Sequence, residues 1–227
     1  MSKGRRIARI PNFVPTPEER ARYLLHWESR HLFHGTADYP ALTPQFLFNT
    51  DQPFTLEIGP GTGELLCALA AENPSQNYFG VDLSRRSLYY ALHQAAQAGL
   101  TNIRFLRADI LLALPRLAPA SLAGVLLLFP DPNLAARHRR RRAFQPALLD
   151  ALAVALAPAA RILVVSDDED LFTDMLAIAE ADPRYRKTHA APWLDGFEPP
   201  VKTRFQQVWE KKGRVIKRFE LERVTAG

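Results

Sequence analysis

The segment FTLEIGPGTGELLCALAAENP, residues 54–74, sets the fold expected for this chain. FTLEI is an apolar stretch of strand length, and GELLCALAAENP reads as a helix that ends at Pro74. Between them Gly59, Gly61 and Gly63 alternate, which lets the backbone turn sharply and approach a ligand at the helix N-terminus. Glycine-rich turns also arise for steric reasons alone, so the turn by itself does not identify a ligand.

Strand-like and helix-like segments alternate along the chain after this turn. Strands are expected at residues 77–82, 102–109, 122–130 and 161–167, and helices at residues 86–99, 144–158 and 169–182. The expected strands are apolar almost throughout, which is typical of a parallel sheet covered by helices on both faces. Strand character around residues 215–221 adds an antiparallel edge strand near the C-terminus. The predicted fold class is α/β, with a doubly wound, mainly parallel sheet.

The first fifty residues differ in character from the rest of the chain. Prolines interrupt them repeatedly, and residues 17–31 between two of these prolines read as a helix. We expect residues 1–50 to form a basic, helical extension that packs on the core or on a partner. Residues 51–227 are expected to form the main domain, within a single domain overall at this length.

Charge and cysteine content narrow the classes of function. The net charge is +5, with cations gathered near the N-terminus, in RHRRRR at residues 137–142 and in the C-terminal tail. Separated basic clusters favour a polyanionic partner, and solubility explains them about as well. The longest apolar run, residues 125–129, is too short to cross a membrane, and the single cysteine, Cys67, excludes an internal disulfide. His138 has no His or Cys at metal-ligand spacing, so no metal site is expected. The short apolar runs and the single cysteine lead us to expect a cytoplasmic protein without membrane association.

Acidic residues recur at the expected strands. Glu57 lies in the first strand, Asp82 ends the second, and Asp109 ends the third. Ligands of doubly wound sheets bind beyond these carboxyl ends, where one carboxylate can accept both ribose hydroxyls and the next can accept from an adenine amino group. Each acid alone also suits a helix N-cap. The glycine turn has neither the G-x-G-x-x-G nor the P-loop pattern, so phosphate binding has no support.

The order E-x-G-x-G-x-G, then GVD, then RAD, resembles the binding apparatus of class I S-adenosylmethionine-dependent methyltransferases. The resemblance covers residues 54–174 and implies the Rossmann-like fold of that family. In the family the glycine turn lies under the methionine part, the second strand end holds the ribose, and the third lies near the adenine. The resemblance implies S-adenosylmethionine as cofactor, bound by Glu57, Gly59, Gly61, Gly63, Asp82, Asp109 and Asp131.

The fourth strand leads into LLLFPDPNLAARHRRRR, residues 126–142. It lacks the Asn/Asp-Pro-Pro-Tyr order of amino-directed nucleic-acid methyltransferases, which argues against chemistry on an adenine amino group. The series of motifs is instead similar to that of bacterial tRNA (guanine-N7)-methyltransferases: FPDP at 129–132, RHRRRR, Gln145, Ser166-Asp167 and TRFQ at 203–206. The resemblance implies an enzyme that methylates guanine N7, with tRNA as its partner.

Asp131 is the expected catalytic residue. Guanine N7 carries an in-plane lone pair and no proton, so methyl transfer needs alignment more than a base. The guanine becomes cationic, and a nearby carboxylate stabilises that charge. The expected substrate contacts are Arg137, Arg139, Asp167, Thr203, Arg204, Phe205 and Gln206.

Four positions depart from the family pattern. Asn133 stands in place of Trp, Ala135 of Lys, Ser166 of Thr, and Gln206 of Glu. Asn133 and Ala135 put guanine positioning, rather than cofactor binding, in question. Two other functions therefore stay open: a class I methyltransferase for another RNA site or a small molecule, and a catalytically impaired RNA-binding relative.

The arginine block has two interpretations. One is a solvated helix start paired with acids such as Asp150 or Glu169. The other is a phosphate clamp, which the mutual repulsion of five arginines in six residues favours. The sequence does not decide between a monomer and a homodimer.

Overall fold

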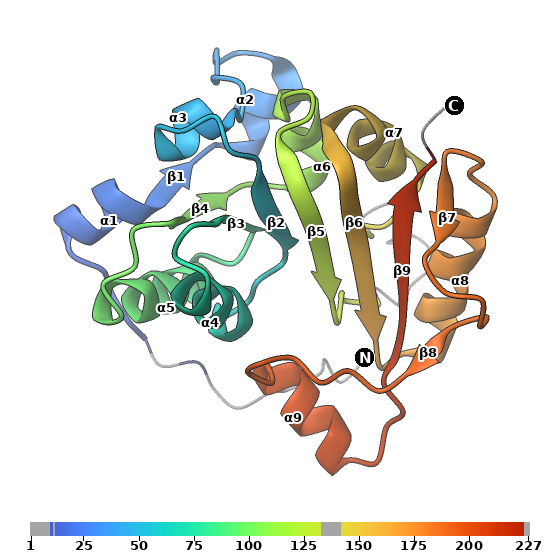
Figure 1. The fold of residues 1–227 in the computed structure, drawn as a ribbon. Coiled ribbons are helices and arrows are strands. Elements are labelled where there is room, and N and C mark those ends of the chain that lie inside the picture. Colours follow the sequence, from blue (N-terminus) through green and yellow to red (C-terminus); the bar gives the residue numbers. More distant parts are fainter. Residues whose placement is uncertain (1–9, 11, 133–141, 225–227) are drawn as a thin grey trace.

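The structure is a computed structural model that describes residues 10, 12–132 and 142–224 (Figure 1). The helices are α1 (Pro17–Tyr23), α2 (Ser29–His34), α3 (Pro44–Phe48), α4 (Glu64–Glu72), α5 (Arg85–Gln97), α6 (Ile110–Ala113), α7 (Pro146–Ala155), α8 (Glu169–Glu180) and α9 (Arg204–Lys211), with a 3-10 turn at Leu114–Arg116. The strands are β1 (Leu24–His26), β2 (Phe54–Ile58), β3 (Asn77–Asp82), β4 (Ile103–Arg107), β5 (Leu122–Leu128), β6 (Leu156–Ser166), β7 (Tyr185–Lys187), β8 (Leu194–Asp195) and β9 (Lys217–Arg223).

The strands form one sheet in the order β1-β4-β3-β2-β5-β6-β9-β7, and β8 also pairs with β9. Strands β1 to β6 are parallel, whereas β9 is antiparallel to β6 and to its other neighbours. The chain progresses from β2 to β4 on one side and from β5 to β6 on the other. Such a reversal places a ligand crevice at the carboxyl ends of β2 and β5. In Figure 1 the arrowheads of β5 and β6 point toward α9.

Two layers of helices bury the faces of the sheet. On one face α4 and α5 pack Leu66 and Leu92 against Phe105 of β4. On the other, α7 and α8 contribute Leu149 and Phe172 to the main core. Each of these side chains stabilises the fold by about 1.5–3 kcal/mol when fully buried. The layered α/β fold predicted from the apolar strands is confirmed.

The N-terminal region differs from the prediction. The helix expected over residues 17–31 ends at Tyr23, and Leu24–His26 pairs with β4. The Tyr23 hydroxyl donates to the Leu100 carbonyl at 2.8 Å, which ties α1 to the turn after α5. Periodicity could not reveal a three-residue strand whose partner lies far along the chain. The division of the chain at residue 50 stays a prediction.

The second half of the sheet also shows differences. The helix expected over residues 144–158 ends at Ala155, and β6 begins at Leu156 and runs through Pro158. The antiparallel strand predicted near residues 215–221 is confirmed as β9, but β7 lies outside it, so β9 is not the edge. The short elements β7, β8 and α9 were not predicted.

Candidate functional site

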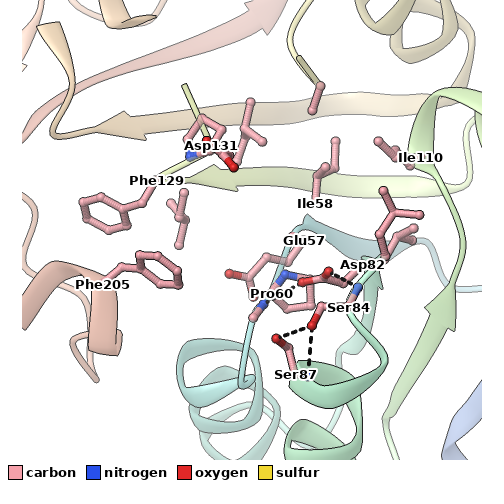
Figure 2. Close-up of a pocket in the computed structure, with 18 of the residues that line it drawn as sticks. Glu57, Ile58, Pro60, Asp82, Ser84, Ser87, Ile110, Phe129, Asp131 and Phe205 are labelled. Atoms are coloured by element: carbon pink, nitrogen blue, oxygen red, sulfur yellow. Dashed lines mark hydrogen bonds between the residues drawn. The ribbon is translucent and has the colours of Figure 1, made fainter. Parts of the chain in front are cut away.

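A cavity of about 920 Å³ opens at the carboxyl ends of β2, β3, β4 and β5 (Figure 2). The glycine turn after β2 and the N-terminal end of α9 complete its wall. In Figure 2, Asp82 and Ile110 lie toward one end, and Asp131, Phe129 and Phe205 lie toward the other. The cavity therefore has two ends formed by different parts of the chain.

The predicted glycine turn forms part of this wall. Gly59, Gly61 and Gly63 all have positive φ angles, of 74°, 57° and 80°. At Gly63 a Cβ atom would also lie 2.7 Å from Ala91 Cβ, so any side chain there would push α4 away from α5. The turn thus needs glycine for its backbone conformation and for helix packing.

Asp82 lies at the end of β3 and is fixed by the backbone around it. Its Oδ1 accepts from the Ser84 N–H at 2.7 Å, and its Oδ2 accepts from the Gly61 N–H at 3.2 Å. Burial raises the pKa of Asp82 above its usual value, and the N–H groups of Ser84, Gly61 and Leu83 oppose that rise. Each oxygen keeps a lone pair for a ligand, so the side chain can accept two hydroxyl groups.

Asp109 caps a helix and also lines the cavity. Its Oδ1 accepts from the Leu111 N–H at 3.0 Å and so caps α6. The residue also lines the cavity beside Ile110. The cap holds the carboxylate at the strand end without excluding a ligand contact.

Glu57 is the most strongly perturbed acid in the cavity. It is 2% exposed, and its Oε2 has no hydrogen-bond partner among the described residues. Burial, with the nearby carboxylates of Glu64 and Asp82, raises the pKa of Glu57 to about 8. An unsatisfied buried oxygen of this kind is costly unless a ligand pairs with it.

The charge of the cavity decides which ligands fit. Among the described residues that line it, none is Lys, Arg or His. Five are acidic: Glu57, Glu64, Asp82, Asp109 and Asp131. Such a lining repels phosphate-bearing cofactors and favours a cationic ligand. S-adenosylmethionine fits, because it carries a sulfonium and an ammonium group together with ribose hydroxyls and an adenine.

Asp131 lies at the end of the cavity opposite Asp82 and follows a strained strand end. Phe129 has a φ of 50°, unusual for a residue with a Cβ, and such strain costs about 1–3 kcal/mol. The Phe129 N–H donates to the Val165 carbonyl at 2.8 Å, which holds this conformation. This backbone conformation turns the chain away from the sheet just before Asp131. Asp131 is exposed and lines the cavity.

Arg142 anchors the chain on the other side of Asp131. Its Nε donates to the Pro132 carbonyl at 2.9 Å, and its Nη1 donates to Asp174 Oδ2 at 2.6 Å. The side chain is only 12% exposed. Arg142 therefore ties the residue after Asp131 to α8, a role that sequence reasoning missed.

In the arginine block, Arg142 pairs with an acid, Asp174, but its side chain is largely buried and lies before α7, so it does not belong to a solvated helix start. The two acids suggested from the sequence pair elsewhere: Asp150 with Arg184, and Glu169 with Lys217. Arg137 and Arg139 lie outside the described residues, as do Asn133 and Ala135, and the clamp at those positions stays a prediction.

Arg142→Met is expected to lower kcat for the reaction at this cavity about tenfold, because Pro132 loses its anchor and Asp131 shifts from its place. Cofactor affinity should change by less than about threefold, since the glycine turn and Asp82 are untouched. Steady-state kinetics with calorimetric cofactor binding measures both. The control is Arg161→Met, which breaks an exposed pair with Glu220. An unchanged kcat in folded Arg142→Met would remove this role.

The predicted substrate contacts divide into two groups. Thr203 and Phe205 line the cavity, with Arg204 between them at the start of α9. Asp167 and Gln206 are buried and do not line it. The Gln206 amide donates to the Phe197 carbonyl and, at 2.9 Å, to Glu210 Oε1. The contact roles of these residues stay predictions.

Several lining residues were not predicted. They include Thr62, Glu64, Ser84, Ser87, Ile110, Phe129 and Ala143. Most of them flank the glycine turn or a strand-end acid, and that adjacency was the signal available in the sequence. Ala143 had no such signal, because only the folded chain brings it to the cavity.

Within residues 10, 12–132 and 142–224 there is no group of three or more His, Cys, Asp or Glu side chains arranged to hold a metal ion. In the same part of the chain no helix is both long and apolar enough to cross a membrane.

Comparisons with known proteins agree with this geometry. A family model described as a putative methyltransferase matches residues 51–219. A tRNA (guanine-N(7)-)-methyltransferase of Rubrobacter xylanophilus is 44% identical over 219 residues, covering 96% of this chain and 98% of the relative. A protein of the same name from Chloroflexus aurantiacus is 36% identical over 225 residues, covering 99% of each chain.

Solved structures share the fold at low identity. An antibiotic-related methyltransferase has a TM-score of 0.55 at 17% identity, covering 83% of this chain and 96% of the other. TrmN from Thermus thermophilus has a TM-score of 0.54 at 21% identity, covering 79% of this chain and 47% of the other. These two likenesses concern the fold alone.

Proposed function

Because the chain belongs to the tRNA (guanine-N7)-methyltransferase family, we propose that it transfers a methyl group from S-adenosylmethionine to N7 of a guanine in tRNA. The observation that carries the proposal is the cavity with five carboxylates and no described basic side chain. The same charge that suits a sulfonium cofactor also suits a guanine that becomes cationic on methylation. The cytoplasm is the proposed location, because tRNA is the proposed substrate.

The end of the cavity around Asp82 is proposed to hold the cofactor. Asp82 accepts the ribose hydroxyls, Asp109 lies near the adenine, and the unpaired Glu57 oxygen accepts from the ammonium group. The glycine turn lies under the methionine part, where its missing side chains allow close approach. The bound cofactor supplies a methyl group activated by its positive sulfur.

The end around Asp131 is proposed to hold the guanine. Phe205, Phe129 and Thr203 line this end, so two aromatic rings are available to a planar base. Asp131 hydrogen-bonds the guanine edge and stabilises the positive charge that develops as N7 forms its bond to carbon. No side chain has to remove a proton, because N7 carries none, so the contribution of the protein is alignment and charge.

Replacing Arg137, Arg139 and Arg140 by glutamine is expected to weaken tRNA binding by about tenfold and to flatten its salt dependence. Each lost phosphate contact lowers the slope of log affinity against log salt by roughly 0.7–0.9. Filter binding over a salt series measures both quantities. The control replaces Arg161, Arg184 and Arg186 by glutamine, which removes the same number of positive charges. All three of these arginines are ion-paired. Unchanged affinity and slope in the first variant would reject the clamp.

The activity is tested by incubating the protein with labelled S-adenosylmethionine and unmodified tRNA, followed by digestion to nucleosides. The expected product is labelled N7-methylguanosine. Label in another nucleoside would indicate a methyltransferase for a different RNA site. Binding of tRNA and cofactor without label would indicate a catalytically impaired relative.

A further inference from the structure

Arg214 lies just beyond α9 and joins that helix to the sheet. Its Nη1 donates to Asp167 Oδ2 at 2.6 Å, and its guanidinium carbon lies 4.5 Å from the centre of the Trp209 ring. Its backbone N–H donates to the Trp209 carbonyl at 3.0 Å. One side chain thus contacts the end of β6 and the second half of α9.

Asp167 is the partner that gives this contact its strength. It follows β6 directly, and its side chain is fully buried, with 0% exposed, whereas Arg214 is 40% exposed. A carboxylate at this depth requires compensation by a cation or hydrogen bonds, and breaking such a pair from one side is costly. The pair is therefore a strong constraint on the segment that carries Arg214.

The other end of α9 forms the wall of the cavity. Thr203 caps the helix by accepting from the Gln206 N–H at 3.2 Å, and both Thr203 and Phe205 line the cavity. A Cβ atom placed on Gly61 would lie 3.9 Å from Phe205 Cε2, so the ring faces the glycine turn. In Figure 2 the Phe205 and Phe129 rings both lie toward the Asp131 end of the cavity.

The helix between these two ends needs outside support. It has eight residues, too few for stability by itself. Trp209, 4% exposed, packs in one apolar cluster with Leu128 and Phe129. The position of the Phe205 ring therefore depends on how firmly Trp209 and Arg214 hold the helix.

We propose that Arg214 is a positioning residue for methyl transfer, which pairs with Asp167, stacks on Trp209 and holds α9 so that Thr203 and Phe205 close the acceptor end of the cavity. Asp167 is then an anchor for Arg214, and not a direct contact to guanine. The inference rests on the proposed function for the identity of the ligands, but the anchoring of α9 is a property of the free protein.

The test compares Arg214→Met with wild type and with the control Arg161→Met. In free protein, hydrogen exchange should rise across residues 203–214 of Arg214→Met, while β5 and β6 keep their protection. The KM for tRNA should rise by about tenfold, with kcat within about twofold, as expected when the closed arrangement falls to about a tenth of the population. Arg214→Lys should recover part of the loss.

Asp167→Asn separates anchoring from substrate contact. If Asp167 acts only through Arg214, the double variant Asp167→Asn/Arg214→Met has the KM and kcat of Arg214→Met alone. Additive losses would show that Asp167 acts by a route other than Arg214 and would overturn the proposal. Unchanged exchange over residues 203–214, or an unchanged KM, in folded Arg214→Met would also overturn it. A wild-type protein that fails to methylate tRNA refutes the proposed function, whereas the exchange result still decides the role of Arg214.

Discussion

Asp131→Asn should lower kcat for tRNA methylation by about 100-fold at saturating tRNA and cofactor. The amide keeps the shape of the side chain but carries no negative charge to stabilise the methylated guanine. Asp131 is exposed and lies at the acceptor end of the cavity, so the substitution leaves the core intact. Single-turnover measurements isolate the chemical step from tRNA release.

The matched control for this substitution is Asp51→Asn, which removes a charge from an exposed residue outside the cavity. It should retain wild-type kcat. Cofactor affinity of Asp131→Asn should stay within about tenfold of wild type, because Glu57, Asp82 and Asp109 still line the other end. Full methylation by Asp131→Asn at saturating cofactor would show that Asp131 has neither the catalytic role nor an essential substrate contact.

Glu57→Gln should make the free protein more stable at alkaline pH. Burial and neighbouring carboxylates raise the pKa of Glu57 from its ordinary value of 4.5 to about 8. A group whose folded pKa is raised contributes stability below its unfolded pKa, and that contribution is lost as the pH rises through the folded pKa. The variant does not lose stability in this way, so near pH 9 its free energy of unfolding should exceed that of wild type by on the order of 3–5 kcal/mol, roughly 6–20 °C in Tm.

The same substitution should damage cofactor binding. An amide cannot supply the negative charge that the ammonium group of S-adenosylmethionine needs, so its dissociation constant should rise by about 100-fold. Thermal unfolding between acid and alkaline pH, with and without cofactor, measures both effects. Glu72→Gln, at an exposed position at the end of α4, is the control. Equal stability at alkaline pH together with unchanged cofactor affinity would contradict the role given to Glu57.

The candidate site could be predicted where sequence neighbours carry it. Glu57, Asp82 and Asp109 follow from apolar strands that end in an acid, because parallel strands bring their carboxyl ends to one edge. The glycine turn is also recognisable, because Gly59, Gly61 and Gly63 lie close together in the sequence, directly after an apolar strand. These features depend on a few consecutive residues and on strand order, and both leave a pattern in the sequence.

Other parts of the fold and site depend on contacts between distant residues. Arg142 reaches Asp174 across 32 positions, and Arg214 reaches Asp167 across 47. No local pattern distinguishes these two arginines from the other arginines near them in the sequence. The strand Leu24–His26 is too short to show the two-residue alternation of side chains that marks a strand. It forms by pairing with β4, which lies far along the chain. Gln206, a predicted substrate contact, donates its amide to Phe197 and Glu210, and no local pattern reveals these partners.

The central claim, methyl transfer to guanine N7 in tRNA, is tested most directly with a pair of transcripts. One contains ordinary guanosine, and the other contains 7-deazaguanosine, in which a C–H group replaces N7. Labelled methyl should be transferred from S-adenosylmethionine to the first transcript and not to the second, while both compete equally for binding. Equal labelling of the 7-deazaguanosine transcript would contradict the account, because the methyl group would then be on an atom other than N7.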